Sequence, residues 1–352
     1  MPQTIDDEGM RLNGNTTFRH SNAALLSITA VEAPVVVTSD QIDDWLAPAR
    51  KRLRLPRGTL QRVSGVFERR WWKDEEGWVQ APVTAAERAL ARAGVSREQI
   101  GIVINTSVSR RNLEPSVAVA VHAGLGLPTS AMNFDITNAC LGFVNGMTLA
   151  ANMIDAGQID YALVVGAEDM ESTHRGTIDR LNSKDATRED FQYQFASLTL
   201  GSGAAAAVLG PADRHPNGHK LVGTVSRAGS EHHHLCIGSF GHMRTDTKGL
   251  LEHGLALVVD AWRDAHKDGF DFRSADTFIT HQISMVYTRA FAKATGVDID
   301  KIPVTFPDWG NVGPVSLPMT LAKSSESFSP GQKIVLLGVG SGINTGMMEV
   351  TW

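Results

Sequence analysis

The sequence contains only two cysteines in 352 residues, Cys140 and Cys236. Two thiols are too few for a disulfide framework or a four-thiolate zinc site, so the sequence favours a protein of a reducing compartment. No apolar run approaches the length of a membrane span, and residues 1–20 lack the apolar core of a signal peptide. We therefore expect a cytoplasmic protein that begins with a flexible leader over residues 1–20.

Basic residues are not in excess either. The chain has 33 Lys and Arg against 38 Asp and Glu, and its net charge of −5 gives no reason to expect a nucleic-acid partner. The one short basic stretch, "RKRLRLPR" (50–57), is interpreted as a solvated helix end or loop.

Two further clusters look like ligand sites and are interpreted otherwise. The histidines at 232–234 would point alternately to opposite faces of an extended chain, so we predict no metal there. The pair Trp71–Trp72 is expected to pack or to anchor a loop rather than to hold a cofactor.

Four segments of the first half have counterparts, in the same order, in the second half. The central pairs are "MNFDITNACLGFVNGMTLA" (132–150) with "VTFPDWGNVGPVSLPMTLA" (304–322), and "YALVVGAED" (161–169) with "KIVLLGVGS" (333–341). Both central pairs share one offset, which carries position 148 to 320 and position 161 to 333. The outer pairs drift from this offset, as loop insertions would produce: 101–109 with 277–285, and 201–210 with 342–351. The shared order and offset indicate a duplicated unit.

Each copy alternates strands with helices. This pattern predicts mostly parallel sheets covered by helices, with two halves, 21–215 and 216–352, packed about a pseudo-two-fold axis. The offset carries Cys140 to position 312, beside Asn311, so these residues occupy equivalent strand-to-helix junctions. Because such folds bind ligands at the carboxyl ends of parallel strands, we expect the two junctions to meet.

Cys140 has the surroundings of a nucleophile. A thiol at the first turn of a helix faces unpaired backbone N–H groups and the positive end of the helix dipole, which favour the thiolate. The alternative is a buried, inert cysteine, and we assign that part to Cys236, because no strand-to-helix turn surrounds it.

Two polar residues follow predicted strands in the second half. His281 closes "TFITHQIS", and Asn311 lies in "DWGNVGPVS". A lone histidine at a strand end is usually structural. With Cys140, however, the two form a Cys-His-Asn set at one face, whose His and Asn can direct N–H donors at a carbonyl oxygen. The glycine-rich "GVGSGIN" (338–344) would let the Ser341 amide join the Cys140 amide in an oxyanion hole.

The three motifs "NACLGF", "HQIS" and "GNVGPVS" together resemble those of the condensing enzymes of the thiolase superfamily, in the ketoacyl-ACP synthase III branch. The resemblance covers about residues 22–352 and implies a thiolase fold, with duplicated βαβαβ halves in a five-layered αβαβα sandwich. Stretches such as "INTSVSRRNLEPSVA" (104–118) are most similar to enzymes that join two fatty acyl-CoAs head to head in olefin and β-lactone biosynthesis.

The resemblance also implies a base. Synthases that use malonyl donors make a carbanion by losing CO2, whereas joining two acyl chains requires removal of a carbon-bound proton. Biosynthetic thiolases use a second cysteine near the carboxyl terminus, and "GVGSGIN" has none. Glu114, in the "LEPS" segment that precedes the Cys140 motif, is the candidate. It also suits the start of the helix expected after it, and both interpretations can hold together.

The implied mechanism is ping-pong. Cys140 takes an acyl group from a long-chain acyl-CoA, and His281 and Asn311 hold the second acyl-CoA while Glu114 of a neighbouring subunit removes its α-proton. The product is a 2-alkyl-3-ketoacyl thioester, released as the acid. The resemblance implies a homodimer, or a heterodimer with a paralogue, and no cofactor or metal. Val63 stands where a CoA-binding arginine is expected, so no CoA contact is assigned.

Two other functions remain as alternatives. One is a decarboxylating synthase that uses acyl-CoA and malonyl-ACP. The other is a non-catalytic subunit that supports an active paralogue, which the presence of Cys140, His281 and Asn311 disfavours.

Overall fold

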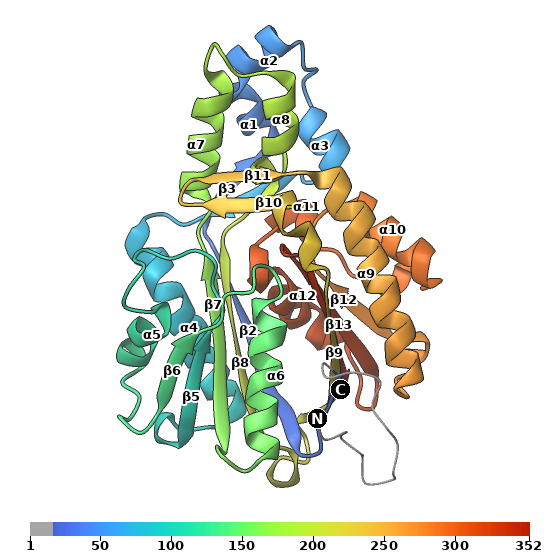
Figure 1. Ribbon diagram of the computed structural model, residues 1–352. Coiled ribbons are helices and arrows are strands. Elements are labelled where there is room, and N and C mark those ends of the chain that lie inside the picture. Colours follow the sequence, from blue (N-terminus) through green and yellow to red (C-terminus); the bar gives the residue numbers. More distant parts are fainter. Residues whose placement is uncertain (1–16) are drawn as a thin grey trace.

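The computed structural model describes residues 17–352. A 10-stranded sheet has the order β12-β13-β14-β9-β2-β8-β7-β5-β6, with β1 (Thr17–Arg19) beside β9 (Figure 1). The first half of the chain contributes β2 (Ala23–Glu32), β5 (Ile100–Asn105), β6 (Met132–Asp135), β7 (Tyr161–Glu168) and β8 (Gly203–Pro211). The second half contributes β9 (His219–Ala228), β12 (Thr277–Thr280), β13 (Lys333–Gly340) and β14 (Asn344–Thr351).

The two halves repeat one strand pattern. In the first, β5 runs parallel to β7, β7 antiparallel to β8, and β8 antiparallel to β2. In the second, β12, β13, β14 and β9 follow the same order with the same directions. The predicted duplication is therefore confirmed.

The prediction of mostly parallel sheets is wrong. Within residues 17–352, parallel ladders join β5 to β6, β5 to β7 and β12 to β13, and the other pairs of the large sheet are antiparallel. The reason is the length of the connections. Only residues 341–343 join β13 to β14, and parallel strands need a crossover of a dozen residues or more.

The pairing of 304–322 with 132–150 predicts a strand at the start of 304–322, and the structure has the short helix α11 (Phe306–Trp309) there instead. Gln282 explains the difference. Its side-chain oxygen accepts hydrogen bonds from the Thr305 and Phe306 amides, at 2.7 Å and 3.3 Å, so these donors are not available to a ladder. Segment 304–306 is therefore bonded to a residue that follows β12 and, within residues 17–352, belongs to no strand.

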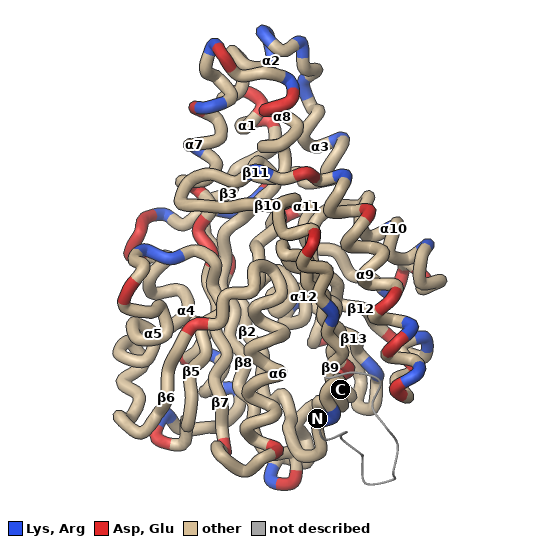
Figure 2. Tube along the Cα trace, in the orientation of Figure 1, with Lys and Arg blue, Asp and Glu red and all other residues tan. Residues whose placement is uncertain are grey.

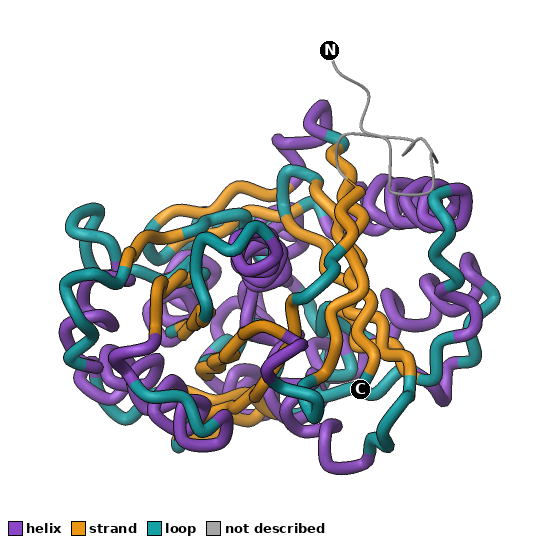
Figure 3. Tube along the Cα trace, turned by 90° about the horizontal axis from the view of Figure 1, so that it is seen from below, coloured by secondary structure: helices purple, strands orange, loops and turns teal. Residues whose placement is uncertain are grey.

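Helices form three layers around the two halves of the sheet. The outer helices are α4 (Glu75–Ala93) and α5 (Val117–Leu125) on the first half, and α9 (Thr247–Lys267) and α10 (Met285–Thr295) on the second (Figure 1). Between the halves lie α6 (Gly142–Asp155) and α12 (Ser316–Ser324). Seen from below, a helix viewed end on has strands on both sides (Figure 3). The molecule is thus the expected five-layered αβαβα sandwich.

Strand residues show why the layers form. Successive side chains of a strand point to opposite faces. In β8, Ala205, Ala207 and Leu209 join the core shared with α6 and α12, while Ala204, Ala206 and Val208 join the core under α4. Both faces of the strand are apolar, so both must be covered, and each fully buried Val or Leu contributes roughly 1.5–3 kcal/mol.

A cap stands over one end of the sandwich, formed by residues 35–71, 171–199 and 236–245 (Figure 1). Its helices are α1 (Ser39–Trp45), α2 (Ala47–Leu53), α3 (Thr59–Ser64), α7 (Glu171–Asn182) and α8 (Arg188–Gln194). Its strands pair as β3 (Val35–Thr38) with β4 (Glu68–Trp71), and β10 (Cys236–Ser239) with β11 (His242–Thr245). Since α7 begins just after β7, the cap covers the carboxyl end of that strand.

The predicted boundary between residues 215 and 216 falls in the connection between β8 and β9. The predicted leader lies mainly on residues 1–16, outside the described residues, and Thr17–Arg19 form β1. Among the described residues, no helix is both long and apolar enough to cross a membrane. Charged residues concentrate in the cap and the outer helices, and few lie on α6 and the strands beside it (Figure 2).

Candidate active site

Cys140 lies in a sharp turn between β6 and α6. The preceding residue, Ala139, has a φ of 44°, in the left-handed region that a non-glycine residue rarely adopts. The side chain of Asn138 fixes the turn, because it donates to Asn145 Oδ1 of α6 at 2.8 Å and accepts from Asn344 Nδ2 at 2.9 Å. Half-buried Cys140 is therefore held between α6 and the turn that joins β13 to β14.

The turn that contains Ser341 lies against the turn that contains Cys140. Gly340, the last residue of β13, makes this approach possible. A Cβ atom added to Gly340 would lie 3.0 Å from the Asn138 carbonyl oxygen and 3.2 Å from the Leu141 nitrogen. A larger residue would push the two turns apart.

His281 follows β12 at the same end of the sheet. Its amide donates to the Leu337 carbonyl at 2.8 Å, which places it beside the carboxyl-terminal half of β13. The side chain is 8% exposed, and its Nδ1 has no hydrogen-bond partner among the described residues. Burial lowers the pKa of His281 to about 4, so the imidazole is neutral at physiological pH.

Asn311 is presented by the segment that precedes α12. Its side-chain oxygen accepts from the Gly313 amide at 2.9 Å and from Ser316 Oγ at 3.4 Å. Its backbone amide donates to the Thr199 carbonyl at 2.9 Å. Because the carboxamide oxygen is engaged by its own turn, the NH2 group is the part available to a substrate carbonyl.

Glu168, at the carboxyl end of β7, is a residue of this site that the sequence interpretation missed. It is fully buried, and its carboxylate accepts from the Val108 amide at 2.7 Å, the Ser109 amide at 2.9 Å and Ser109 Oγ at 2.5 Å. A Cβ atom on Gly313 would lie 3.5 Å from Glu168 Cγ, so this carboxylate also borders the Asn311 turn. The available signal was an acidic residue directly after an apolar strand, in "VVGAED".

The protonation state of Cys140 differs from the prediction. Burial raises the pKa of the Cys140 thiol, and the nearby Cys236 and Glu168 raise it further. The helix α6 begins just after the thiol, at Gly142, and its dipole acts in the opposite direction, toward the thiolate. In the resting chain the thiol is therefore protonated, and it must lose its proton as it attacks.

Glu114 lies on the surface and is not among the buried groups around Cys140. It is exposed, as is its neighbour Leu113, at 78%. It comes shortly before α5, whose N-cap is Ser116, so the interpretation as part of a helix start fits.

Cys236 and the histidines differ from the sequence interpretation in detail. Cys236 begins β10 of the cap, is half-buried, and lies close enough to Cys140 to raise its pKa. The histidines at 232–234 are in a 3-10 helix, Ser230–Leu235, and not in an extended chain. Within residues 17–352, no group of three or more His, Cys, Asp or Glu is arranged to hold a metal ion.

The tryptophan pair packs as predicted. Trp71 donates through Nε1 to His174 Nδ1 at 2.7 Å, and Trp72 donates through Nε1 to the Glu168 carbonyl at 2.9 Å. Both rings are buried, so the pair ties the cap to the end of β7.

The basic stretch at 50–57 is the end of α2 and the loop after it, also as predicted.

An apolar cavity adjoins His281. It lies between α9, α10 and the ends of β12 and β13, and its walls include Leu255, Val258, Phe291 and Val339. A cavity of this composition suits a hydrocarbon chain with its polar end at the imidazole.

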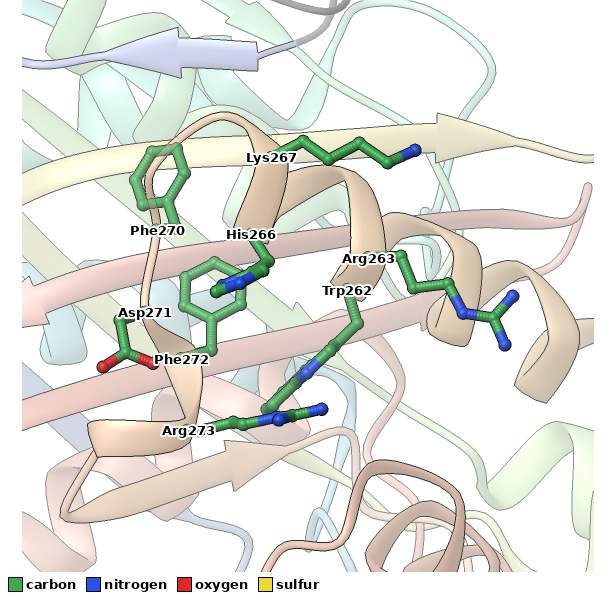
Figure 4. A pocket seen from close by; sticks show the side chains of 8 residues that line it. All are labelled: Trp262, Arg263, His266, Lys267, Phe270, Asp271, Phe272 and Arg273. Carbon is green, nitrogen blue, oxygen red and sulfur yellow. The ribbon is translucent and has the colours of Figure 1, made fainter.

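A second cavity, of about 280 Å³, lies at the end of α9 away from the cap (Figures 1 and 4). Trp262, Phe270 and Phe272 line it. Two of its cations are engaged locally, Arg263 with Asp260 at 3.3 Å and Lys267 with Asp264 at 3.0 Å. None of the predicted site residues borders this cavity.

Two family models match parts of the chain. Residues 79–207 match the N-terminal domain of thiolase, and residues 265–352 match the C-terminal part of 3-oxoacyl-[acyl-carrier-protein] synthase III. An acyl-CoA:acyl-CoA alkyltransferase of Xanthomonas campestris is 40% identical over 334 residues, which cover 94% of this chain and 99% of the relative. An enzyme of the same name from Shewanella oneidensis is 32% identical and covers 95% and 100%.

Solved structures give the same picture. A cysteine-to-serine variant of X. campestris OleA, with bound lauric acid and lauroyl-CoA, superposes with a TM-score of 0.91 at 39% identity, covering 95% of this chain and all of that one. Other structures of that protein carry changes at a glutamate and at a histidine. Its altered glutamate precedes its altered cysteine by the same separation in sequence as Glu114 precedes Cys140 here.

Proposed function

The chain belongs to the acyl-CoA:acyl-CoA alkyltransferases, condensing enzymes of the thiolase fold, and on this premise we propose that it joins two long-chain fatty acyl-CoAs through an acyl-cysteine at Cys140. The observation that carries the proposal is the turn of Cys140, which packs against the end of β13 that leads to Ser341, while the His281 amide donates to Leu337 of the same strand. The glycine-rich turn opposite it holds no second cysteine, so the base must come from elsewhere.

The first half-reaction acylates the enzyme. The neutral imidazole of His281 accepts the thiol proton as Cys140 attacks the thioester carbonyl. The buried, uncharged state of both groups supports this order, because it avoids an isolated charge before substrate binds. The Cys140 and Ser341 amides stabilise the oxyanion, and coenzyme A leaves with the proton.

The second half-reaction forms the carbon–carbon bond. His281 and the NH2 group of Asn311 donate to the carbonyl oxygen of the second acyl-CoA. Glu114 removes its α-proton, and the carbanion attacks the acyl group on Cys140, whose sulfur leaves. The product is a 2-alkyl-3-ketoacyl-CoA, released as the acid after hydrolysis. Side chains and backbone amides perform every step, so we include no cofactor.

We infer that Glu114 acts in the site of a second copy of the chain. Glu114 is exposed here, and the neighbouring β6 is a sheet edge that pairs only with β5 within residues 17–352. Exposed apolar side chains surround this edge, among them Leu113, Val119 and Met132. An open strand edge with apolar neighbours is suited to pairing with its own copy, and burial there would place the Glu114 loop against the partner.

A charge on this edge tests the dimer. Met132→Glu should shift the protein from dimer to monomer in analytical ultracentrifugation, while Cys140 acylation by lauroyl-CoA persists and condensation is lost. The exposed Val286→Glu, on α10, is the matched control and should remain dimeric. A monomeric Met132→Glu variant that still condenses acyl-CoA would contradict the assignment in trans.

The two unpaired cysteines support a cytoplasmic location.

Product analysis tests the reaction class. We expect the purified chain, given lauroyl-CoA as its sole substrate, to form a β-keto product containing two lauroyl chains, detected by mass spectrometry. Cys140→Ala should form none and should release no coenzyme A. A product that appears only when malonyl-ACP is added would replace this proposal with the decarboxylating synthase. No product until a paralogous subunit is added would replace the homodimer with a heterodimer.

A further inference from the structure

The loop that carries Glu114 is anchored at both ends by carboxylates. This loop, residues 106–116, joins β5 to α5. At its start, Glu168 accepts three hydrogen bonds from Val108 and Ser109. At its end, Asp135 accepts from the amides of Val117 and Ala118, at 3.0 Å and 2.9 Å. The two anchors belong to β7 and β6, so the sheet itself fixes where the loop leaves and where it returns.

The middle of the loop is held weakly. Residues 111–115 are exposed, and a cavity of about 200 Å³ lies beneath them, bordered by Trp78, Pro82 and Ala167. Arg111 pairs with Glu75 at 2.7 Å, but both side chains are more than half exposed, and such surface pairs contribute little. The position of Glu114 therefore depends mainly on the two anchored ends.

Glu168 is the more deeply buried of the two anchors. Three donors converge on one buried carboxyl group, and hydrogen bonds to the ionised form of such a group are about twice as strong as neutral ones. Burial raises the pKa of Glu168 to about 7, and the bonds from Ser109 and Val108 oppose this rise. Ser109 Oγ is itself fixed, because it accepts from the Asp169 amide at 3.1 Å. Trp72, which directly follows β4 of the cap, donates through Nε1 to the Glu168 carbonyl. An amide in place of this carboxylate would point an N–H group at one of the three donors.

We infer that Glu168 is a positioning residue for condensation, which fixes the Glu114 loop and through it the carboxylate that removes the α-proton. The inference rests on the proposed function of Glu114. Glu168 touches neither substrate nor the reacting atoms in this account. It acts by holding residues 108 and 109, and the same side chain borders the Asn311 turn, so it links the base to the groups that hold the second substrate.

The test compares Glu168→Gln with Asp169→Asn, which changes the adjacent acid without altering the three bonds to the loop. We expect Glu168→Gln to slow condensation about 10- to 100-fold at saturating lauroyl-CoA, with an unchanged KM, as a displaced catalytic group would. Acylation of Cys140, measured by intact-protein mass, should be slowed by no more than about threefold, because that step does not use Glu114 and a neutral residue at position 168 removes one of the charges that raise the pKa of the thiol. Asp169→Asn should keep both rates within about threefold.

Hydrogen–deuterium exchange reports on the loop directly. Peptides covering residues 108–116 should exchange faster in Glu168→Gln than in wild type or Asp169→Asn, and peptides from α6 should be unchanged. If Glu168→Gln does not fold, Ser109→Ala removes one of the three bonds and should produce smaller changes in the same direction.

Either of two results overturns the inference: unchanged exchange in the loop, or acylation slowed as much as condensation. A failure of the proposed function is recognised separately, because wild type would then form no doubled product from acyl-CoA alone, whatever the exchange data show.

Discussion

The two copies of the duplicated unit differ in the connection that follows two equivalent strands, β5 and β12. After β12, residues 281–284 lead straight into α10, and Gln282 fastens them to the segment that continues toward Asn311. After β5, the longer loop 106–116 runs across the surface before α5 begins. The short connection leaves His281 buried and neutral, and the long one leaves Glu114 exposed.

This difference separates two kinds of proton chemistry. An imidazole in the core of its own chain has its charge state fixed by burial alone, before any substrate binds. A carboxylate on a surface loop obtains its environment only when a partner and an acyl chain cover it. We therefore expect changes at His281 to affect both half-reactions, and changes at Glu114 to affect only the second.

The largest effect that separates the two residues is expected at Glu114. Glu114→Gln keeps the shape of the side chain and removes the base, so condensation of lauroyl-CoA should fall by about 10²- to 10⁴-fold. Acylation of Cys140, followed by intact-protein mass spectrometry, should continue at the wild-type rate. Condensation at the wild-type rate would mean that another group removes the proton.

His281→Ala should weaken both steps. It removes the acceptor for the thiol proton and one of the two donors to the second thioester oxygen, and loss of one such donor costs about 10²- to 10³-fold. Rates of coenzyme A release and of product formation, measured separately, should both fall. A loss confined to product formation would restrict His281 to the second step.

The pH dependence of stability should also reveal the buried imidazole. Burial lowers the pKa of His281 from 6.5 to about 4, so between these values the unfolded chain binds a proton that the folded chain does not. The contribution of His281 to the free energy of unfolding is therefore fully present above pH 6.5. It is lost as the pH falls toward 4, which lowers the free energy of unfolding by about 3 kcal/mol. His281→Asn should flatten this part of the curve in urea denaturation. His174, whose pKa burial lowers to about 3, contributes equally in both proteins. An identical slope in the two proteins would show that His281 is not buried as described.

The smallest effect is expected in the middle of the Glu114 loop. Arg111→Ala removes the exposed pair with Glu75, and surface pairs contribute about 0–1 kcal/mol. Condensation should therefore stay within about threefold of wild type. A loss as large as that of Glu168→Gln would mean that the surface pair, and not the anchored ends, fixes the loop.

The sequence was sufficient for the layout of the fold and for the strand-to-helix junction of Cys140, whereas the predicted counterpart at Asn311 follows the short helix α11 and not a strand. Strand-forming runs and the offset between the two halves can be read directly from the sequence. The repeat that they predict is found in the structure, where β5, β7 and β8 correspond to β12, β13 and β14. The direction of pairing was predicted wrongly, although the short turn at 341–343 was a signal for an antiparallel pair.

Long-range contacts account for what the sequence did not reveal. Glu168 accepts hydrogen bonds from Val108 and Ser109, which lie in a different strand-to-helix loop about 60 positions earlier. The residues around "GAED" therefore give no indication of these bonds. The raised pKa of the Cys140 thiol likewise depends on burial and on Cys236 from the cap, which the residues next to Cys140 in the sequence do not reveal. The absence of a strand at 304–306 follows from the side chain of Gln282, which lies before α10 and is distant in the sequence.

Subunit mixing shows whether an exposed carboxylate of one chain completes the site around the thiol of another. Cys140→Ala and Glu114→Ala homodimers should each be inactive in condensation. After mild dissociation and reassociation of an equal mixture, each mixed dimer holds one site with both groups intact, and condensation of lauroyl-CoA should return to about a quarter of the wild-type rate per chain, from random pairing. A mixture that stays inactive, although mass spectrometry shows that mixed dimers have formed, would contradict the account.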